Sequence, residues 1–233
     1  MRFLTKTHQL LTEIEAFIII KRGAFFMPRM LDLCSGFGGA SEAFVDAGWE
    51  VIRIDNNRAF SDPESDYYVP HTIYGNLMPG LDFHVSIPDA MNFDFIWASP
   101  PCYEFSNAFH APRAIAAREG NLDTYSPDMT IVTVIKQIID NLQPKYWAIE
   151  NVAGAKKHFE PLLGKPALSL QPYYIWGNFP GTFIKDPTHS KKANGDKYRR
   201  HPLRANYRAI IPYYLSEQFL HAVDGQSNLK EWL

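Results

Sequence analysis

The sequence predicts an α/β protein whose mostly parallel sheet is covered by helices on both faces. The chain has 233 residues, 46% of them hydrophobic and 21% charged, which suits a globular protein with one sizeable core. From Met30 onward, short apolar runs typical of strands alternate with amphipathic helical runs. Polar residues, glycines or prolines follow each apolar run, and in such sheets ligands collect at the carboxyl ends of the strands.

The expected elements follow one another in this alternating order. Strands are expected at 30–36, 50–57, 94–101 and 145–152, and helices at 41–49 and 128–142. A closing helix is expected over 212–223, because Leu215, Phe219, Leu220 and Val223 then share one side. We therefore divide the chain into an extension at 1–27 that is expected to be helical, a core at 28–160, an aromatic and basic segment at 161–208, and a closing helix at 209–233 that packs back on the core.

Composition excludes several classes of protein. The chain has 23 Lys and Arg against 25 Asp and Glu, so no overall basic field is present, although basic residues gather at 191–208. Cys34 and Cys102 are the two cysteines, which excludes a disulfide-stapled scaffold and a four-cysteine zinc site, and no metal is expected. No apolar run reaches the length of a membrane span, and no signal peptide is recognisable, so the cytoplasm is the expected location.

A glycine turn follows the first expected strand. Gly36, Gly38 and Gly39 stand between that strand and a helix, where a backbone can approach a ligand and a helix start offers unpaired N–H groups. A dinucleotide fingerprint would need a third glycine at Ser41, so it fits less well. The second strand ends at Asp55, whose carboxylate can accept hydrogen bonds from ribose hydroxyls. An adenosine-containing ligand is favoured, and a tight turn without any ligand is the alternative.

Two further strand ends carry reactive side chains. Pro100 and Pro101 end the third of these strands and stiffen the loop after it, which puts Cys102 at the mouth of the same crevice. Cys102 is a candidate nucleophile, although cysteine is also a common small buried residue. Glu150 ends the fourth strand, where a carboxylate is either solvated or functional because burying it unpaired is costly.

Taken in chain order, these motifs resemble the DNA cytosine methyltransferases that act at ring carbon 5. The matching stretches are Asp32 to Gly39, Asp55, Pro101 to Ser106 and Glu150 to Val152, so that residues 29–155 are covered well. The final segment from Arg204 to Val223 is only loosely similar. The resemblance implies the Rossmann-like fold of S-adenosylmethionine-dependent methyltransferases, and it makes 28–160 the catalytic and cofactor-binding core. It implies methyl transfer from S-adenosylmethionine to carbon 5 of cytosine in DNA.

The resemblance also implies the roles of individual residues. Cys102 would add to carbon 6 of a flipped cytosine, Glu150 would hydrogen-bond or protonate ring nitrogen 3, and Asn151 would fix the loop bearing Glu150. The residues expected to bind the cofactor are Asp32, Ser35, Gly36, Phe37, Gly38, Gly39, Asp55, Asn76 and Pro100. Contacts to nucleic acid are expected from Tyr103, Ser106, Arg199, Arg200 and Arg204.

The sequence departs from the family in ways that leave alternatives open. Tyr103 stands where the family usually has glutamine, and Cys34 where it has phenylalanine; we interpret Cys34 as a packed small residue. Ser99-Pro100-Pro101 also matches methyltransferases that act on an exocyclic amine, but Glu150 has no role in that chemistry. The sequence is also compatible with a catalytically inactive binding module, and with RNA or a free nucleotide as the substrate.

The length of the chain limits its recognition of a target. Only 83 residues follow Glu150, and members of the family with a full recognition domain need considerably more. Target recognition is therefore expected to be confined to the short aromatic and basic segment at 161–208, or to come from a separate partner.

Overall fold

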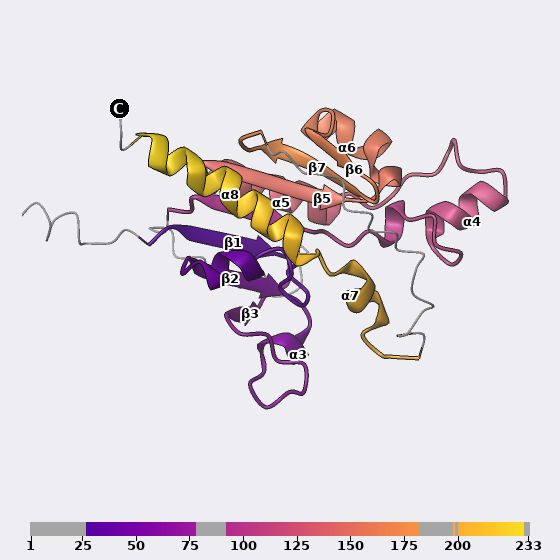
Figure 1. The fold of residues 1–233 in the computed structure, drawn as a ribbon. Helices are drawn as coiled ribbons and strands as arrows, with labels where there is room; N and C mark the ends of the chain where they lie inside the picture. The colour runs from indigo at the N-terminus through magenta and orange to yellow at the C-terminus, as the bar shows by residue number, and fades with distance from the viewer. Residues whose placement is uncertain (1–26, 78–91, 182–197, 199, 231–233) are drawn as a thin grey trace, which may run out of the picture.

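The computed structural model describes residues 27–77, 92–181, 198 and 200–230, so the extension predicted at 1–27 lies almost wholly outside the described residues. Seven strands form one sheet in the order β3-β2-β1-β4-β5-β7-β6 (Figure 1). The strands are β1 (Arg29–Leu33), β2 (Glu50–Asp55), β3 (Thr72–Tyr74), β4 (Phe95–Ala98), β5 (Tyr146–Asn151), β6 (Leu168–Leu170) and β7 (Tyr173–Asn178).

The sheet is mostly parallel, which confirms the predicted fold class. Strands β1 to β5 pair in parallel, and β7 pairs antiparallel to both β5 and β6. The four strands predicted from apolar runs are β1, β2, β4 and β5. Strands β6 and β7 were not predicted, because prolines and glycines surround them. Strands β6 and β7, which lie within the segment assigned to target recognition, therefore belong to the central sheet, where Ile175 pairs with Glu150.

Helices cover both faces of this sheet. Figure 1 shows α8 running across the sheet on the side that also carries α2. The helical elements are α2 (Glu42–Asp46), α3 (Arg58–Ser61), α4 (Pro112–Arg118), α5 (Thr130–Leu142), α6 (Lys156–Leu163), α7 (Arg204–Ala209) and α8 (Tyr213–Lys230), with short 3-10 turns η1 (Tyr103–Phe105) and η2 (Ala153–Ala155). None of the helices in the described part of the chain is long and apolar enough to cross a membrane.

Two hydrophobic clusters, one on each face, hold the layers together. On the first face Phe219 of α8 packs on Phe95 and Trp97 of β4, with ring centroids 6.0 and 5.0 Å away. The four residues predicted to share one side of the closing helix are all buried. On the second face, buried residues of α5 such as Ile135 and Ile139 pack with Phe159 of α6. Burial of these apolar faces stabilises the three-layer arrangement.

The parallel strands bring the predicted site residues to one edge of the sheet. Leu33, the last residue of β1, is level with Ile54 of β2 and Ala98 of β4, and Ala98 is level with Ile149 of β5. The residues that follow these positions therefore meet at the carboxyl edge of the sheet. In Figure 1 the arrows of β1 and β5 point toward this edge, on the side of α4 and α7.

Candidate active site

A buried asparagine joins the two strand ends that carry Cys102 and Glu150. Asn151 is 1% exposed, and its side-chain amide donates a hydrogen bond of 3.0 Å to the carbonyl oxygen of Pro100. Its side-chain oxygen accepts from the N–H of Val152 at 2.9 Å. The resemblance implies that Asn151 steadies the loop bearing Glu150, and this role stays a prediction. The hydrogen bond itself ties the loop before Cys102 to the end of β5.

Gly154 reinforces the same junction and was missed in the sequence analysis. A Cβ atom at this position would lie 2.0 Å from the carbonyl oxygen of Phe105, so only glycine lets η2 pack this closely on η1. The small residues that follow Asn151 were the only signal in the sequence. The two loops after β4 and β5 are thus held together by one hydrogen bond and one close backbone contact.

Cys102 and Glu150 lie on neighbouring strand ends and are both partly exposed. Cys102 directly precedes η1, and its carbonyl oxygen accepts from the N–H of Phe105 at 3.0 Å. The side chain of Glu104 points elsewhere, because it accepts a hydrogen bond of 2.5 Å from the hydroxyl of Tyr125. The loop after β4 is therefore fixed around a thiol that a substrate could reach.

The glycine turn is tied to the end of β2 by Asp55. One carboxylate oxygen of Asp55 accepts from the N–H of Gly36 at 2.8 Å, and the other accepts from the N–H of Asn57 at 2.9 Å. Burial raises the pKa of Asp55, against these backbone hydrogen bonds. Asn76 lies nearby, since the N–H of Gly75 donates to the carbonyl oxygen of Asp55. The contact of Asp55 with a ribose stays a prediction.

Beneath the turn lies a buried polar network. Ser41 donates to Asp32 at 2.6 Å and accepts from Nε of Arg53 at 2.8 Å. Asp32 is fully buried, and burial raises the pKa of its carboxyl group to about 7, although Ser41 and the charge of Arg53 act in the opposite direction. Asp32 therefore lies under the turn, and within the described residues its second carboxylate oxygen and the hydroxyl of Ser35 are buried without a hydrogen-bond partner.

The three glycines of the turn differ in what a side chain at each position would meet. A Cβ at Gly38 would lie 2.5 Å from Nε of Arg53, and one at Gly39 would lie 2.3 Å from the carbonyl oxygen of Ile211. Gly38 also has a φ of +74°, in the left-handed region. Only Gly36 faces open space, with the side-chain nitrogen of Asn206 as its nearest atom at 3.9 Å. Two of the three glycines thus make room for protein atoms, and Gly36 is the one that leaves room for a ligand.

Cys34 packs as the sequence analysis expected. It lies at the start of the turn with a φ of +57°, and it is partly buried against the second hydrophobic cluster. Burial and the nearby carboxylates of Asp55 and Asp32 raise the pKa of its thiol, so the thiol stays protonated and a poor nucleophile.

Residues from the C-terminal part of the chain cover the turn. The Phe37 ring lies 4.5 Å from Tyr207 of α7 and 4.9 Å from Phe60. Tyr207 in turn stacks on Tyr198 with centroids 4.1 Å apart. Tyr207 was not predicted, because no pattern in a single sequence links the end of the basic segment to a turn about 170 residues earlier.

Of the arginines predicted to contact nucleic acid, Arg204 is the first residue of α7, Arg200 is exposed, and Arg199 lies outside the described residues.

Two exposed aromatic rings follow Cys102. Tyr103 is 59% exposed and Phe109 is 68% exposed, the highest values among the large hydrophobic residues of the described chain. The guanidinium of Arg118 lies 4.2 Å from the centre of the Phe109 ring, and Tyr103 donates to the carbonyl oxygen of His110. Ser106 accepts from the N–H of Ala108 at 3.0 Å and so shapes the turn between the rings. Phe109 was not singled out from the sequence.

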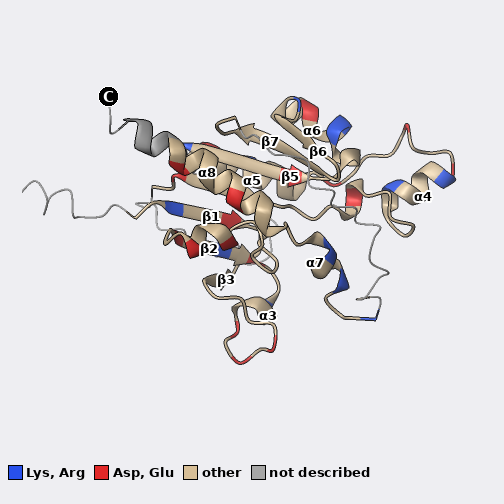
Figure 2. Cartoon of the chain, viewed as in Figure 1, with Lys and Arg blue, Asp and Glu red and all other residues tan. Residues whose placement is uncertain are grey.

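Basic residues gather around the carboxyl edge. Figure 2 shows Lys and Arg on α4, α6 and α7, at the end of the molecule toward which β1 and β5 point. These residues are Arg113, Arg118, Lys156, Lys157, Arg204 and Arg208. This near-neutral chain thus places basic residues on three elements at the end of the molecule that carries Cys102, where they can attract phosphates, and Figure 2 also shows acidic residues on α6 and beside α4.

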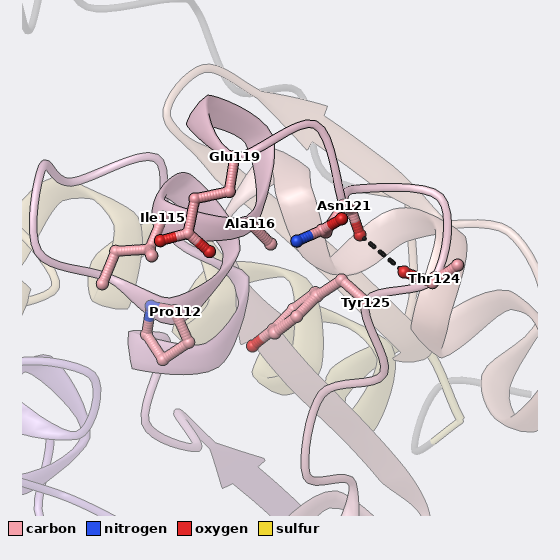
Figure 3. Close-up of a pocket in the computed structure, with 7 residues that line it drawn as sticks. All are labelled: Pro112, Ile115, Ala116, Glu119, Asn121, Thr124 and Tyr125. Carbon is pink, nitrogen blue, oxygen red and sulfur yellow. Dashed lines mark hydrogen bonds between the residues drawn. The ribbon is translucent and has the colours of Figure 1, made fainter.

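An open groove of about 340 Å³ lies beside this edge. Figure 3 shows that α4 and Glu119 form one wall and that the turn from Asn121 to Tyr125 forms the other. Tyr125 connects the groove to the loop after β4 through its hydrogen bond to Glu104. In the part of the chain that the structure describes, no group of three or more His, Cys, Asp or Glu is arranged to hold a metal ion.

Comparisons with known proteins point to one family. The family model described as C-5 cytosine-specific DNA methylase matches residues 28–163, more than half of the chain. Type II methyltransferase M.HindV of Haemophilus influenzae is 30% identical over 131 residues, which cover 55% of this chain and 39% of that protein. Type II methyltransferase M.HgiGI of Herpetosiphon aurantiacus is 26% identical over 129 residues, which cover 55% of this chain and 93% of that protein.

The chain spans about two fifths of the length of M.HindV and of M.HgiDI, a second relative from Herpetosiphon aurantiacus. The region that matches a solved structure of the Entamoeba histolytica methyltransferase EhMeth covers 68% of this chain and 55% of that protein's chain, with 17% sequence identity and a TM-score of 0.40.

Proposed function

Because the chain belongs to the C-5 cytosine-specific DNA methylase family, we propose that it transfers a methyl group from S-adenosylmethionine to carbon 5 of cytosine in DNA. The observation that carries this proposal is the hydrogen bond from Asn151 to Pro100, which couples the loop of Cys102 to the strand end of Glu150. This chemistry needs a thiol and a carboxyl group on opposite sides of one ring, held in a fixed relation.

The proposed reaction uses Cys102 and Glu150 together. The deprotonated Cys102 sulfur, a thiolate, forms a bond to carbon 6 of cytosine, and the electron pair of the 5,6 double bond moves to carbon 5. Glu150 donates a hydrogen bond or proton to ring nitrogen 3, which stabilises the negative charge that develops on the ring. After carbon 5 gains the methyl group, a base removes its proton, the double bond re-forms and the Cys102 sulfur leaves.

The glycine turn is the proposed cofactor site. S-adenosylmethionine supplies an electrophilic methyl group when bound. The buried, unpartnered oxygen atoms of Asp32 and Ser35 and the open space at Gly36 fit a ligand with donor groups. Asp55 is proposed to accept from the ribose and Asn76 to approach the adenine, with Phe37, Gly38, Gly39 and Pro100 completing the wall.

The proposed substrate is DNA in which the target cytosine is flipped out of the duplex, since stacked bases hide carbon 6 from a thiol. The exposed Tyr103 and the basic residues of α4, α6 and α7 support this part of the proposal. Ser106, Arg199, Arg200 and Arg204 complete the proposed contact residues. A separate partner is proposed to supply part of the target recognition, and the cytoplasm is the proposed location.

DNA that contains 5-fluorocytosine tests the mechanism. With S-adenosylmethionine present, the wild-type protein is expected to form a covalent adduct that survives denaturing electrophoresis, because fluorine at carbon 5 blocks the final elimination. Cys102→Ala should form no adduct, whereas Cys34→Ala, the matched control, should form it normally. Methylated cytosine without any adduct would reject the role of Cys102.

Mass spectrometry of the product nucleosides separates methylation at carbon 5 from methylation of an amine. The same assay should be repeated with RNA and with free nucleotides as alternative substrates.

A further inference from the structure

Arg53 is a buried charge that the proposed reaction does not use. It lies in β2 and is 5% exposed, although burying a guanidinium is costly unless its donors are satisfied. An arginine inside the apolar run Val51 to Ile54 is unusual for a strand that is buried on both faces. Its buried guanidinium therefore needs hydrogen-bond acceptors within the protein.

The hydrogen bonds of Arg53 reach three separate backbone segments. Its Nε donates to the hydroxyl of Ser41 at 2.8 Å, at the residue before α2. Its two terminal nitrogens donate to the carbonyl oxygen of Gly38 at 3.2 Å and to that of Pro70, just before β3, at 2.9 Å. Through Ser41 the network also reaches Asp32 in β1. One planar guanidinium thus joins β2 to the glycine turn, to the start of α2 and to the approach to β3.

The shape of the glycine turn depends on this contact. The guanidinium occupies the space that a side chain at Gly38 would need, with three of its atoms within 2.9 Å of an ideal Cβ. The carbonyl oxygen of Gly38, which also accepts from the N–H of Ser41 at 3.1 Å, is held toward the inside of the protein. Because each peptide unit is planar, fixing this carbonyl also fixes the direction of the N–H of Gly39 on the same unit.

We propose that Arg53 is a positioning residue for the cofactor site: its guanidinium holds the Gly36 to Gly39 turn in the conformation that binds S-adenosylmethionine. This inference rests on the proposed function. Arg53 does not touch the cofactor and acts only through Gly38 and Ser41. A preorganised turn binds its ligand more tightly than one that must be ordered on binding.

The first test compares Arg53→Lys with wild type by calorimetric titration of S-adenosylmethionine. Lysine keeps the positive charge near Asp32 but lacks the planar fork, so it cannot reach Ser41, Gly38 and Pro70 together. We expect the dissociation constant to rise at least about tenfold, because this change corresponds to the loss of a single strong hydrogen bond. The methylation rate at saturating cofactor should stay within about threefold, because bound cofactor again orders the turn. Arg29→Lys is the matched control, since Arg29 bonds Glu50 at the opposite end of the same two strands.

The second test is chemical rescue. Arg53→Ala leaves a cavity of guanidinium shape, and we expect millimolar guanidinium ion to restore most of its affinity for S-adenosylmethionine, whereas the same concentration of sodium chloride should not. Arg53→Met, which fills the space without a donor, should not be rescued. Rescue separates positioning by hydrogen bonds from a general packing role.

The outcomes are distinguishable. If the wild type does not bind S-adenosylmethionine, the proposed function fails. If the wild type binds it and Arg53→Lys and Arg53→Met bind equally well, the inference about Arg53 is overturned while the function stands. If none of the three Arg53 variants folds, or if guanidinium ion restores nothing, Arg53 serves folding only, and the positioning role is also overturned.

Discussion

Among single residues, Asp32 shows most directly what burial does to the site. Its carboxyl has a pKa of about 7 in the folded chain, above the ordinary value of 3.8, so the folded state holds a proton that the unfolded state releases at lower pH. The contribution of Asp32 to the free energy of unfolding therefore falls as pH rises from about 4 to about 7 and is constant above that. The full difference is on the order of 4 kcal/mol.

The prediction for Asp32→Asn follows from this sign. The amide oxygen of asparagine can still accept the hydrogen bond from Ser41, but it does not titrate. Urea unfolding between pH 5 and pH 8 should show a shallower loss of stability in Asp32→Asn than in wild type, and the variant should be the more stable protein at pH 8. Asp66→Asn, at an exposed carboxyl, is the control. Equal slopes for wild type and Asp32→Asn would contradict the raised pKa.

Gly154 gives a second prediction at this scale. A methyl group there would lie 2.0 Å from the carbonyl oxygen of Phe105, so Gly154→Ala must push η1 and η2 apart. Such overpacking costs about 1–3 kcal/mol of stability. Because η1 directly follows Cys102, the methylation rate should fall by more than about tenfold. Gly181→Ala, where nothing lies within 4 Å, should change neither. Normal kinetics in Gly154→Ala would show that the close contact does not position Cys102.

These residues mark how far the sequence could predict the site. Cys102, Glu150 and Asn151 were recognisable because they lie at or just after the end of a strand in an ordered motif, and the register of β4 and β5 places these strand ends side by side. Gly154 and Arg53 were not recognised, because their importance lies in contacts with segments distant in the chain. A single sequence reports which residue follows a strand, but it does not report which backbone atom lies 2.0 Å from the Cβ position of a glycine.

At the scale of elements, the segment from η1 to α4 carries the most exposed large hydrophobic side chain among the described residues. Phe109 is 68% exposed beneath the guanidinium of Arg118, and such rings gain about 1–3 kcal/mol when they stack on a nucleic acid base. Phe109→Ala should therefore leave the free energy of unfolding nearly unchanged and weaken binding to DNA about tenfold. Fluorescence anisotropy of labelled DNA measures the affinity.

Ile73→Ala is the control for Phe109, because Ile73 is 52% exposed on β3 at the other side of the sheet. Unchanged affinity in Phe109→Ala would show that the ring does not meet DNA. A large loss of stability would instead make Phe109 part of the fold.

Some helices and strands were predicted from the sequence and others were not. Strands β1, β2, β4 and β5 and the helices α5 and α8 were predicted because their apolar patterns are long and their ends are marked. Strand β3 has three residues, two of them exposed, and β6 alternates weakly, so neither has a pattern to read. Strand β7 has a strong apolar run, Tyr173 to Trp176, but its aromatic residues and the prolines around it favoured a recognition loop. The segment is nevertheless a strand because it pairs with β5, and such pairing depends on the tertiary structure and not on the local sequence.

On the scale of the whole molecule, three elements that carry basic residues lie at the end where the proposed chemistry takes place. The net charge is −2, yet Lys and Arg of α4, α6 and α7 surround the carboxyl edge of the sheet (Figure 2). Because each phosphate contact releases counterions, the logarithm of the DNA association constant should fall linearly with the logarithm of salt concentration, with a slope of about −0.9 per contact. The change in this slope when a basic residue is neutralised therefore reports how many phosphates that residue binds.

We expect the double variant Lys156→Gln and Lys157→Gln, on α6, to reduce the magnitude of this slope by about 1 to 2, and Arg204→Gln with Arg208→Gln, on α7, to do the same. Arg29→Gln, at the amino end of β1, should leave it unchanged. Affinity measured from about 50 to about 300 mM salt gives all slopes, and the methylation rate at saturating DNA serves as a check that the variants remain folded. If α7 alone changes the slope, DNA lies only along the basic segment predicted from the sequence. If α6 contributes as well, DNA crosses the whole edge between α6 and α7 and passes over Cys102, the path that a flipped cytosine requires.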